Sequence, residues 1–148
     1  MSMIHRRGEE VRLMVIDGQG GGIGATIIRG LRESVGNEVE ILALGTNSIA
    51  TSRMMKAGAN KGATGENAVV RTIRIVDVVI GPLSVVMANS MMGELTPKMA
   101  AAVSSREVKK LLIPLTQENV EIVGGVGEPL PHLVARVVEI IKEMKENV

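Results

Sequence analysis

Two kinds of apolar pattern alternate along the first third of the chain, and this alternation most constrains the fold. Residues 11–16 form a short apolar run, which is typical of a strand buried in a parallel sheet. After a glycine-rich segment, apolar residues recur every fourth position, as on one face of a helix: Ile23, Ile27, Leu31 and Val35. Residues 39–44 are a second apolar run. This order predicts a βαβ unit with a right-handed crossover.

The same alternation continues to the end of the chain. Gly36 is predicted to end the first helix, and Thr46, Asn47 or Ser48 to cap a second helix that ends near Gly58. Further helices are expected over 64–75, over 97–106 and from 131, strands over 77–80 and 110–115, and a loop over 59–65. Residues 120–123 are a candidate short strand. Residues 83–95 are apolar but fit neither period.

We therefore expect a three-layer α/β fold with a mostly parallel, open sheet of four or five strands. A single domain is expected over 11–148, after a flexible N-terminus at 1–10. The strand order stays open between a Rossmann-like and a flavodoxin-like arrangement, because 83–95 cannot be placed. Such sheets bind ligands at the carboxyl ends of their strands. The polar segments that should gather there are 17–24, 45–48, 81–84 and 116–119.

Composition excludes several kinds of chemistry. The chain of 148 residues contains no Phe, Tyr, Trp or Cys, so tyrosine acids, aromatic stacking on bases and thiolates are absent. Two isolated histidines give no metal-ligand spacing, and no metal site is expected. A net charge of +1 gives no strong field for nucleic acid, and no apolar stretch is long enough for a membrane span. A cytoplasmic location is the default expectation.

The glycine loop, residues 18–24, is the most informative segment. It lies between the first predicted strand and the first predicted helix, where a phosphate meets free N–H groups and the positive end of the helix dipole. Gly20, Gly22 and Ala25 match G-x-G-x-x-A, a variant of the dinucleotide-binding pattern. The alternative is a tight turn without a ligand. The predicted binding residues are Gly18, Gln19, Gly20, Gly21, Gly22, Ile23, Gly24, Thr46, Asn47 and Gly81.

Three known patterns fit the loop incompletely. Short-chain dehydrogenases need a Tyr–Lys pair, and the chain has no tyrosine. The dinucleotide-binding pattern expects an acid about 20 residues on, at the end of the second strand, to hold a ribose diol. Thr46 and Asn47 stand there instead, and Arg53 could reach a 2′-phosphate. The deviant Walker loop of the septum-site ATPases has its spacing here, but Gly20 and Ala25 replace its two lysines, which argues against ATP hydrolysis.

Several segments together resemble an uncharacterised family of small bacterial proteins that is common in clostridia-like anaerobes. The resemblance covers nearly all of 12–123 and is carried by residues 16–24, 43–47, 56–60, 62–67 and 119–124. It implies a Rossmann-like fold and no established activity. Members of the family often carry a cysteine just before the segment that starts at Asn119, where this chain has Glu118.

Three functions stay open at this point. The leading hypothesis is a binding module for a phosphate-bearing ligand, a nucleotide or dinucleotide such as NAD(P). The second is a small enzyme that uses polar residues at the strand ends: Asp17, Thr46, Asn47, Ser84 and Glu118. The third is a structural or partner-binding homodimer that associates through the Met-rich segment 84–95. Asp17 could cap N–H groups of the loop, or hold a ligand or a metal through water.

Overall fold

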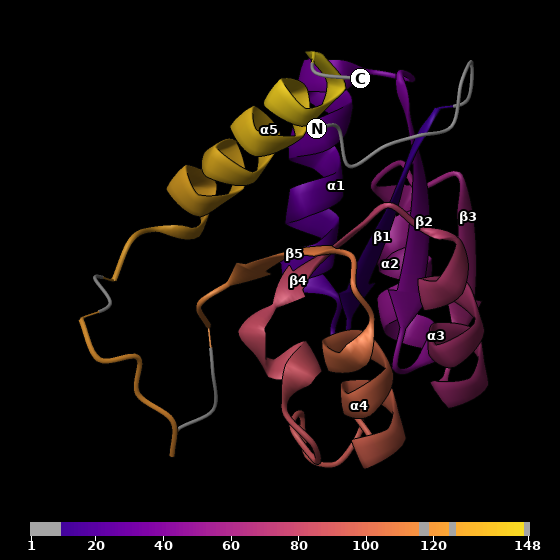
Figure 1. Cartoon of the computed structure of the whole chain (residues 1–148), viewed down its shortest axis with the longest axis vertical. Coiled ribbons are helices and arrows are strands. Elements are labelled where there is room, and N and C mark those ends of the chain that lie inside the picture. Colours follow the sequence, from indigo (N-terminus) through magenta and orange to yellow (C-terminus); the bar gives the residue numbers. More distant parts are fainter. Residues whose placement is uncertain (1–9, 116–118, 125–126, 147–148) are drawn as a thin grey trace.

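Five parallel strands form a single sheet in the order β3-β2-β1-β4-β5 (Figure 1). The computed structural model describes residues 10–115, 119–124 and 127–146. The strands are β1 (Val11–Asp17), β2 (Val39–Gly45), β3 (Lys61–Thr64), β4 (Val78–Pro82) and β5 (Lys109–Ile113). This is the order of a Rossmann-type sheet, in which the chain reverses direction across the sheet between β1 and β4. Of the two strand orders that the sequence left open, the structure has the Rossmann-like one.

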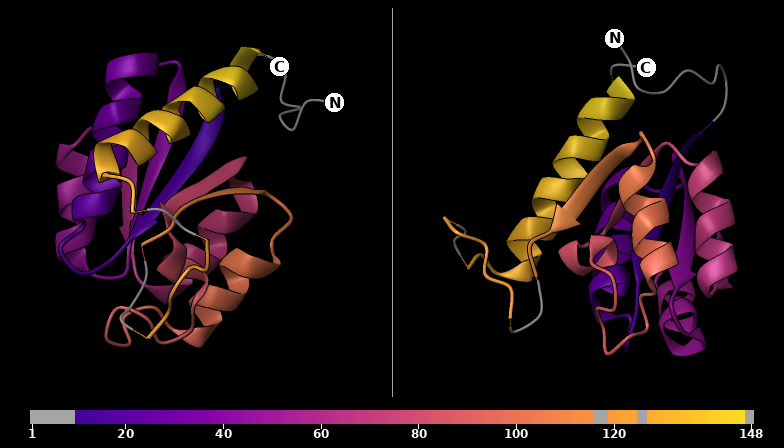
Figure 2. Two further views of the ribbon diagram at one scale, coloured as in Figure 1. Left: turned by 90° about the vertical axis from the view of Figure 1, so that its left-hand side faces the viewer. Right: turned by 60° about the horizontal axis from the view of Figure 1, so that its bottom comes forward.

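Helices cover both faces of the sheet, which confirms the expected three layers. The helices α1 (Gly22–Val35), α2 (Ser48–Lys56) and α5 (Leu130–Glu146) pack on one face. The opposite face carries α3 (Glu66–Thr72), α4 (Pro97–Ser105) and the 3-10 turn η1 (Ile73–Ile75). Figure 2 shows α5 in yellow and α4 in orange on opposite sides of the sheet.

The core consists of two aliphatic layers, one on each face of the sheet. Successive residues of β1 point alternately into the two layers: Leu13 and Val15 join α1 and α5, whereas Met14 and Ile16 join α3 and α4. All four side chains are fully buried. The apolar run of β1 is continuous because both of its faces are covered.

Two expectations about the strands were wrong. Residues 59–65, expected to be a loop, contain the edge strand β3. Its residues are small or polar and all exposed, so no apolar run marks it. Thr64, where the next helix was expected to begin, belongs to this strand, and α3 begins at Glu66 after Gly65. Residues 120–123, the candidate fifth strand, form no strand in the described segment 119–124.

The segment that fitted neither period is a non-repetitive connection. After β4 it forms the 3-10 turn η2 (Leu83–Val86) and then the β4–α4 loop, residues 87–96. Asn89, Met91 and Met92 have left-handed backbone conformations, with φ of 65°, 56° and 57°. Such conformations carry no side-chain periodicity, which explains the ambiguous pattern. Thr96 caps α4, because its Oγ1 accepts a hydrogen bond from Met99 N at 3.2 Å.

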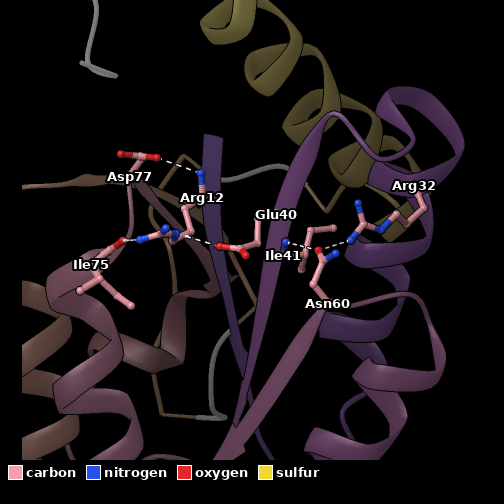
Figure 3. Close-up of polar contacts among 7 residues, drawn as sticks. All are labelled: Arg12, Arg32, Glu40, Ile41, Asn60, Ile75 and Asp77. Carbon is pink, nitrogen blue, oxygen red and sulfur yellow. Dashed lines mark hydrogen bonds and ion pairs between the residues drawn. The ribbon is translucent and has the colours of Figure 1, made fainter. Parts of the chain in front are cut away.

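Polar contacts tie the strands together at the edge of the sheet where β1 and β2 begin (Figure 3). The backbone N–H of Arg12 donates to Asp77 at 2.8 Å, and the Arg12 side chain pairs with Glu40 at 2.7 Å. Asn60 Oδ1 accepts from Ile41 N at 2.7 Å, where the chain enters β3. Asp77 therefore lies away from the glycine loop and has a structural role.

Candidate functional site

The glycine loop bends over the start of α2, and this shape requires glycine at position 21. Gln19 and Gly21 both have positive φ, 49° and 72°, and Gly21 N donates to Gly18 O at 2.9 Å. A Cβ on Gly21 would lie 2.8 Å from Ala50 Cα and 2.9 Å from Ala50 O. Real Cβ atoms do not approach backbone so closely. The loop is therefore seated on the first turn of α2.

The carboxylate of Asp17 binds the two ends of the glycine loop. This carboxylate is buried and accepts hydrogen bonds from Gly18 N at 2.8 Å and from Gly24 N at 2.7 Å. Burial raises the pKa of Asp17, and the nearby Glu94 carboxylate adds to this, while the N–H donors of Gly24 and Gly18 lower it. Of the two roles left open for Asp17, the structure shows the capping of loop N–H groups.

Glu94, which the sequence analysis did not single out, enters the site from the β4–α4 loop. Its Oε1 accepts from Thr46 Oγ1 at 2.6 Å, from Gln19 N at 2.8 Å and from Asn47 Nδ2 at 2.8 Å. These donors lower the pKa of Glu94, the Thr46 hydroxyl most strongly, so the side chain is ionised at neutral pH. One feature of the sequence could have drawn attention to Glu94: it is the only charged residue between Asp77 and Lys98.

Thr46 and Asn47 meet the glycine loop, as expected from the gathering of strand ends. Thr46 N donates to Asp17 O at 3.0 Å, and Asn47 Nδ2 donates to Gln19 O at 2.9 Å. Asn47 also caps α2, because its Oδ1 accepts from Ala50 N at 2.9 Å. Hydrogen bonds thus join the ends of β1 and β2 into one polar cluster, which we call the platform: Asp17, Gln19, Thr46, Asn47 and Glu94.

Gly20 and Gly22 differ from the other glycines of the loop. Neither has a positive φ, and a Cβ on either would meet only the guanidinium of Arg53, with Nη1 at 3.7 Å for Gly20 and at 3.6 Å for Gly22. Their N–H groups have no hydrogen-bond partner among residues 10–115, 119–124 and 127–146. Arg53 Nη1 donates to Gly20 O at 3.3 Å, which places its guanidinium beside these groups. The guanidinium of Arg53 therefore lies beside the part of the loop in which the N–H groups of Gly20 and Gly22 are free.

The remaining predicted binding residues lie in packed positions. Ile23 and Gly24 belong to the first turn of α1, and a Cβ on Gly24 would lie 2.5 Å from Met54 Sδ. Gly81 is buried in β4, where a Cβ would lie 2.5 Å from Ile16 O. Close packing accounts for both of these glycines, so neither needs a ligand to explain it.

The residues proposed for a small enzyme are only partly brought together. Thr46, Asn47 and the buried Asp17 share the platform, whereas Ser84 is buried in η2 and its carbonyl accepts from Ser90 Oγ at 2.6 Å. Glu118 lies outside the described residues. Within the described ranges, no group of three or more His, Asp or Glu side chains could hold a metal ion. None of the described helices is long and apolar enough to cross a membrane.

Comparison with known proteins places the chain in a family. A solved structure with a similar fold is a dodecameric FMN-dependent UbiX-like decarboxylase from Escherichia coli O157:H7, with 15% sequence identity and a TM-score of 0.47 over 89% of this chain and 94% of that chain. No curated protein matches the sequence. The profile of a domain of unknown function, DUF3842, matches residues 12–146. The expected membership in an uncharacterised family is thereby confirmed, and the chain belongs to the DUF3842 family.

Proposed function

We propose that this protein binds a small phosphate-bearing ligand, a nucleotide or dinucleotide, on the side of the glycine loop that faces Arg53. The observation that carries the proposal is that Gly20 and Gly22 have free N–H groups and no structural need to be glycine. Neither glycine is required by packing or by φ, and both have N–H groups without a described partner. Glycine at such positions allows a phosphate oxygen to approach the backbone, with no Cβ in its way.

Charge favours the same side of the loop. Arg53 supplies a guanidinium beside Gly20, and the N-terminus of α1 begins at Gly22. Both features attract an anion. Of the two carboxylates nearby, Asp17 accepts hydrogen bonds from N–H groups of the loop, and one oxygen of Glu94, Oε1, is bonded to Gln19, Thr46 and Asn47. A phosphate between Gly20, Gly22 and Arg53 would therefore meet donors and positive charge first.

The position of the loop in the sheet favours a ligand larger than a phosphate. The loop follows β1, next to the point where the strand order reverses between β1 and β4, which is where nucleotides bind in open α/β sheets. Two exposed apolar side chains flank the platform in sequence: Ile49 is 70% exposed and Met92 is 94% exposed. Such side chains offer apolar surface to a base, in a chain that has no aromatic residue to stack on one.

Calorimetry on a panel of ligands tests the proposal directly. Inorganic pyrophosphate, ADP, ATP, NAD, NADP and FAD are titrated into the wild-type protein, and thermal unfolding is measured with each. A ligand that binds only the native state raises its apparent stability by RT ln(1 + [L]/Kd). We expect at least one member of the panel to bind. The absence of any heat signal or melting shift at millimolar concentration contradicts the proposal.

A pair of variants on one helix then locates the site. Arg53→Gln removes the cation beside the loop and should weaken pyrophosphate binding about ten- to hundredfold, since a charged hydrogen bond contributes about 1.5–3 kcal/mol. Lys56→Gln makes the same change of charge at the last residue of α2 and should leave the affinity unchanged. Equal effects of the two variants would mean that the anion senses only the general charge of α2.

A further inference from the structure

An ionised carboxylate occupies the end of β2, although no acid lies there in the sequence. The strand ends at Gly45 and is followed by Thr46 and Asn47, which are neutral. Glu94 reaches this place from the β4–α4 loop, with its Oε1 2.6 Å from Thr46 Oγ1 and 2.8 Å from Asn47 Nδ2. In dinucleotide-binding folds an acid at the end of the second strand accepts hydrogen bonds from a ribose diol.

We propose that Glu94 determines the specificity of this site, and that it selects ribonucleotides with free 2′ and 3′ hydroxyl groups. The inference rests on the proposed function, because a ribose reaches Glu94 only when the attached phosphate is held at Gly20 and Gly22. The ligand class is ribonucleotides without a 2′-phosphate, and Glu94 is the residue that recognises their ribose hydroxyl groups.

One oxygen of Glu94 is fixed while the other is left for a ligand. The three hydrogen bonds within the protein all go to Oε1, from Gln19, Thr46 and Asn47. Oε2 makes no hydrogen bond with any residue of the described ranges. A carboxylate held through one oxygen presents the other in a set direction, and an ionised acceptor forms stronger hydrogen bonds with hydroxyl groups than a neutral one.

The β4–α4 loop holds Glu94 in position on both sides. Glu94 N donates to Met91 O at 3.1 Å, and Leu95, which follows, is fully buried with its N–H donating to Ser90 O at 3.2 Å. Ser90 is itself buried and donates its hydroxyl to Ser84 O at 2.6 Å. The acid is therefore placed before a ligand arrives, and no rearrangement is needed to bring it to the end of β2.

The contact of Glu94 with the loop and the first free N–H group of the loop lie on consecutive residues. Glu94 contacts the loop at Gln19 N, whereas the free donors begin at Gly20 N, the next residue. Arg53 lies on the Gly20 side, where it donates to Gly20 O. We expect a 5′-phosphate held at Gly20 and Gly22 to place its ribose near Glu94, because Glu94 contacts the residue that precedes Gly20. A phosphate on the 2′ oxygen would bring a second anion against an ionised carboxylate, which repels it.

The test compares three probes on three proteins. ADP, 2′-deoxy-ADP and inorganic pyrophosphate are titrated calorimetrically into the wild type, Glu94→Gln and Glu107→Gln. The last variant neutralises an exposed carboxylate between α4 and β5 and serves as a matched control. We expect wild type to bind ADP about ten- to hundredfold more tightly than 2′-deoxy-ADP. That preference should disappear in Glu94→Gln and persist in Glu107→Gln, while pyrophosphate binds all three proteins.

The outcomes separate this inference from the function on which it rests. If pyrophosphate and both nucleotides bind wild type with no preference for ADP, the proposed function stands and the role of Glu94 is refuted. The same holds if Glu94→Gln binds ADP more tightly than wild type, since Glu94 would then compete with the ligand for the loop. If none of the three probes binds to wild type, both proposals fail. Thermal unfolding of each variant confirms that the compared proteins are folded.

Discussion

Gly21→Ala is the substitution that most directly tests the described geometry of the glycine loop. Gly21 is the left-handed residue of the loop, with φ of 72°, and its missing Cβ would lie 2.8 Å from Ala50 Cα. Gly22, the next residue, has no positive φ, and its Cβ would lie 3.6 Å from Arg53 Nη1. The two substitutions add the same methyl group to adjacent residues, so their difference isolates the geometry.

The expected cost of Gly21→Ala comes from two sources. A non-glycine residue in the left-handed region costs about 1–2 kcal/mol. Overlap of the new methyl group with the backbone of α2, which cannot move independently of its helix, costs about 1–3 kcal/mol more. Gly21→Ala should therefore lower the free energy of unfolding by about 2–5 kcal/mol, which corresponds to a fall in Tm of roughly 5–20 °C for a chain of this size. Gly22→Ala should be neutral, or stabilising by up to about 1 kcal/mol, because it restricts the unfolded chain.

Urea denaturation followed by far-ultraviolet circular dichroism measures both variants. We expect the midpoint to fall for Gly21→Ala with an unchanged m-value, and to stay within error for Gly22→Ala. Pyrophosphate titration of Gly22→Ala completes the test, because this variant should keep its stability and lose binding. If Gly21→Ala is no more destabilising than Gly22→Ala, the described seat of the loop on α2 is wrong.

Three further predictions follow from other parts of the structure. Asn60→Ala leaves Ile41 N without its acceptor and should destabilise the protein by about 1–3 kcal/mol in urea denaturation, whereas Asn67→Ala, at an exposed position in α3, should change little. The hydrogen bonds to Glu94 lower its pKa in the folded state below the usual glutamate value of 4.5, so the ionised form contributes stability above that pH, and this stability is lost as the pH falls through the folded pKa. The stability difference between wild type and Glu94→Gln should therefore shrink on acidification below about pH 4.5, and a difference that grows would reverse the assigned sign. The homodimer stays a prediction, and a mass of 15.7 kDa by light scattering at micromolar concentration would contradict it.

Most of the fold could be predicted because each buried element has one clear period. The run at 11–16 and the four-residue spacing of Ile23, Ile27, Leu31 and Val35 correspond to β1 and α1. β3 was missed because an exposed edge strand of small residues has no apolar run: Gly62 fits against Met55, where a Cβ would lie 2.9 Å from its Sδ. The order of the strands was open because 83–95 contains left-handed residues that follow neither period.

The site was predictable only where strand ends converge. Thr46 and Asn47 follow β2 directly, and the parallel sheet brings them to the glycine loop. Glu94 was out of reach, because its contact with Gln19 spans 75 residues and depends on a loop without a repeating pattern. Sequence also could not separate Gly21, which the backbone requires, from Gly20 and Gly22, which it does not. That separation needs the position of α2 against the loop.

The wholly aliphatic core has a consequence for how this protein can be observed. Two layers of Val, Ile, Leu, Ala and Met fill both faces of the sheet, and the chain has no tryptophan, tyrosine or phenylalanine. The polypeptide is therefore almost transparent in the near ultraviolet and in the visible range. Any absorption band of the purified protein in that range belongs to a molecule that accompanied it. The spectrum of a fresh preparation thus reports a bound purine or isoalloxazine ring without labelling, displacement or a reporter mutation.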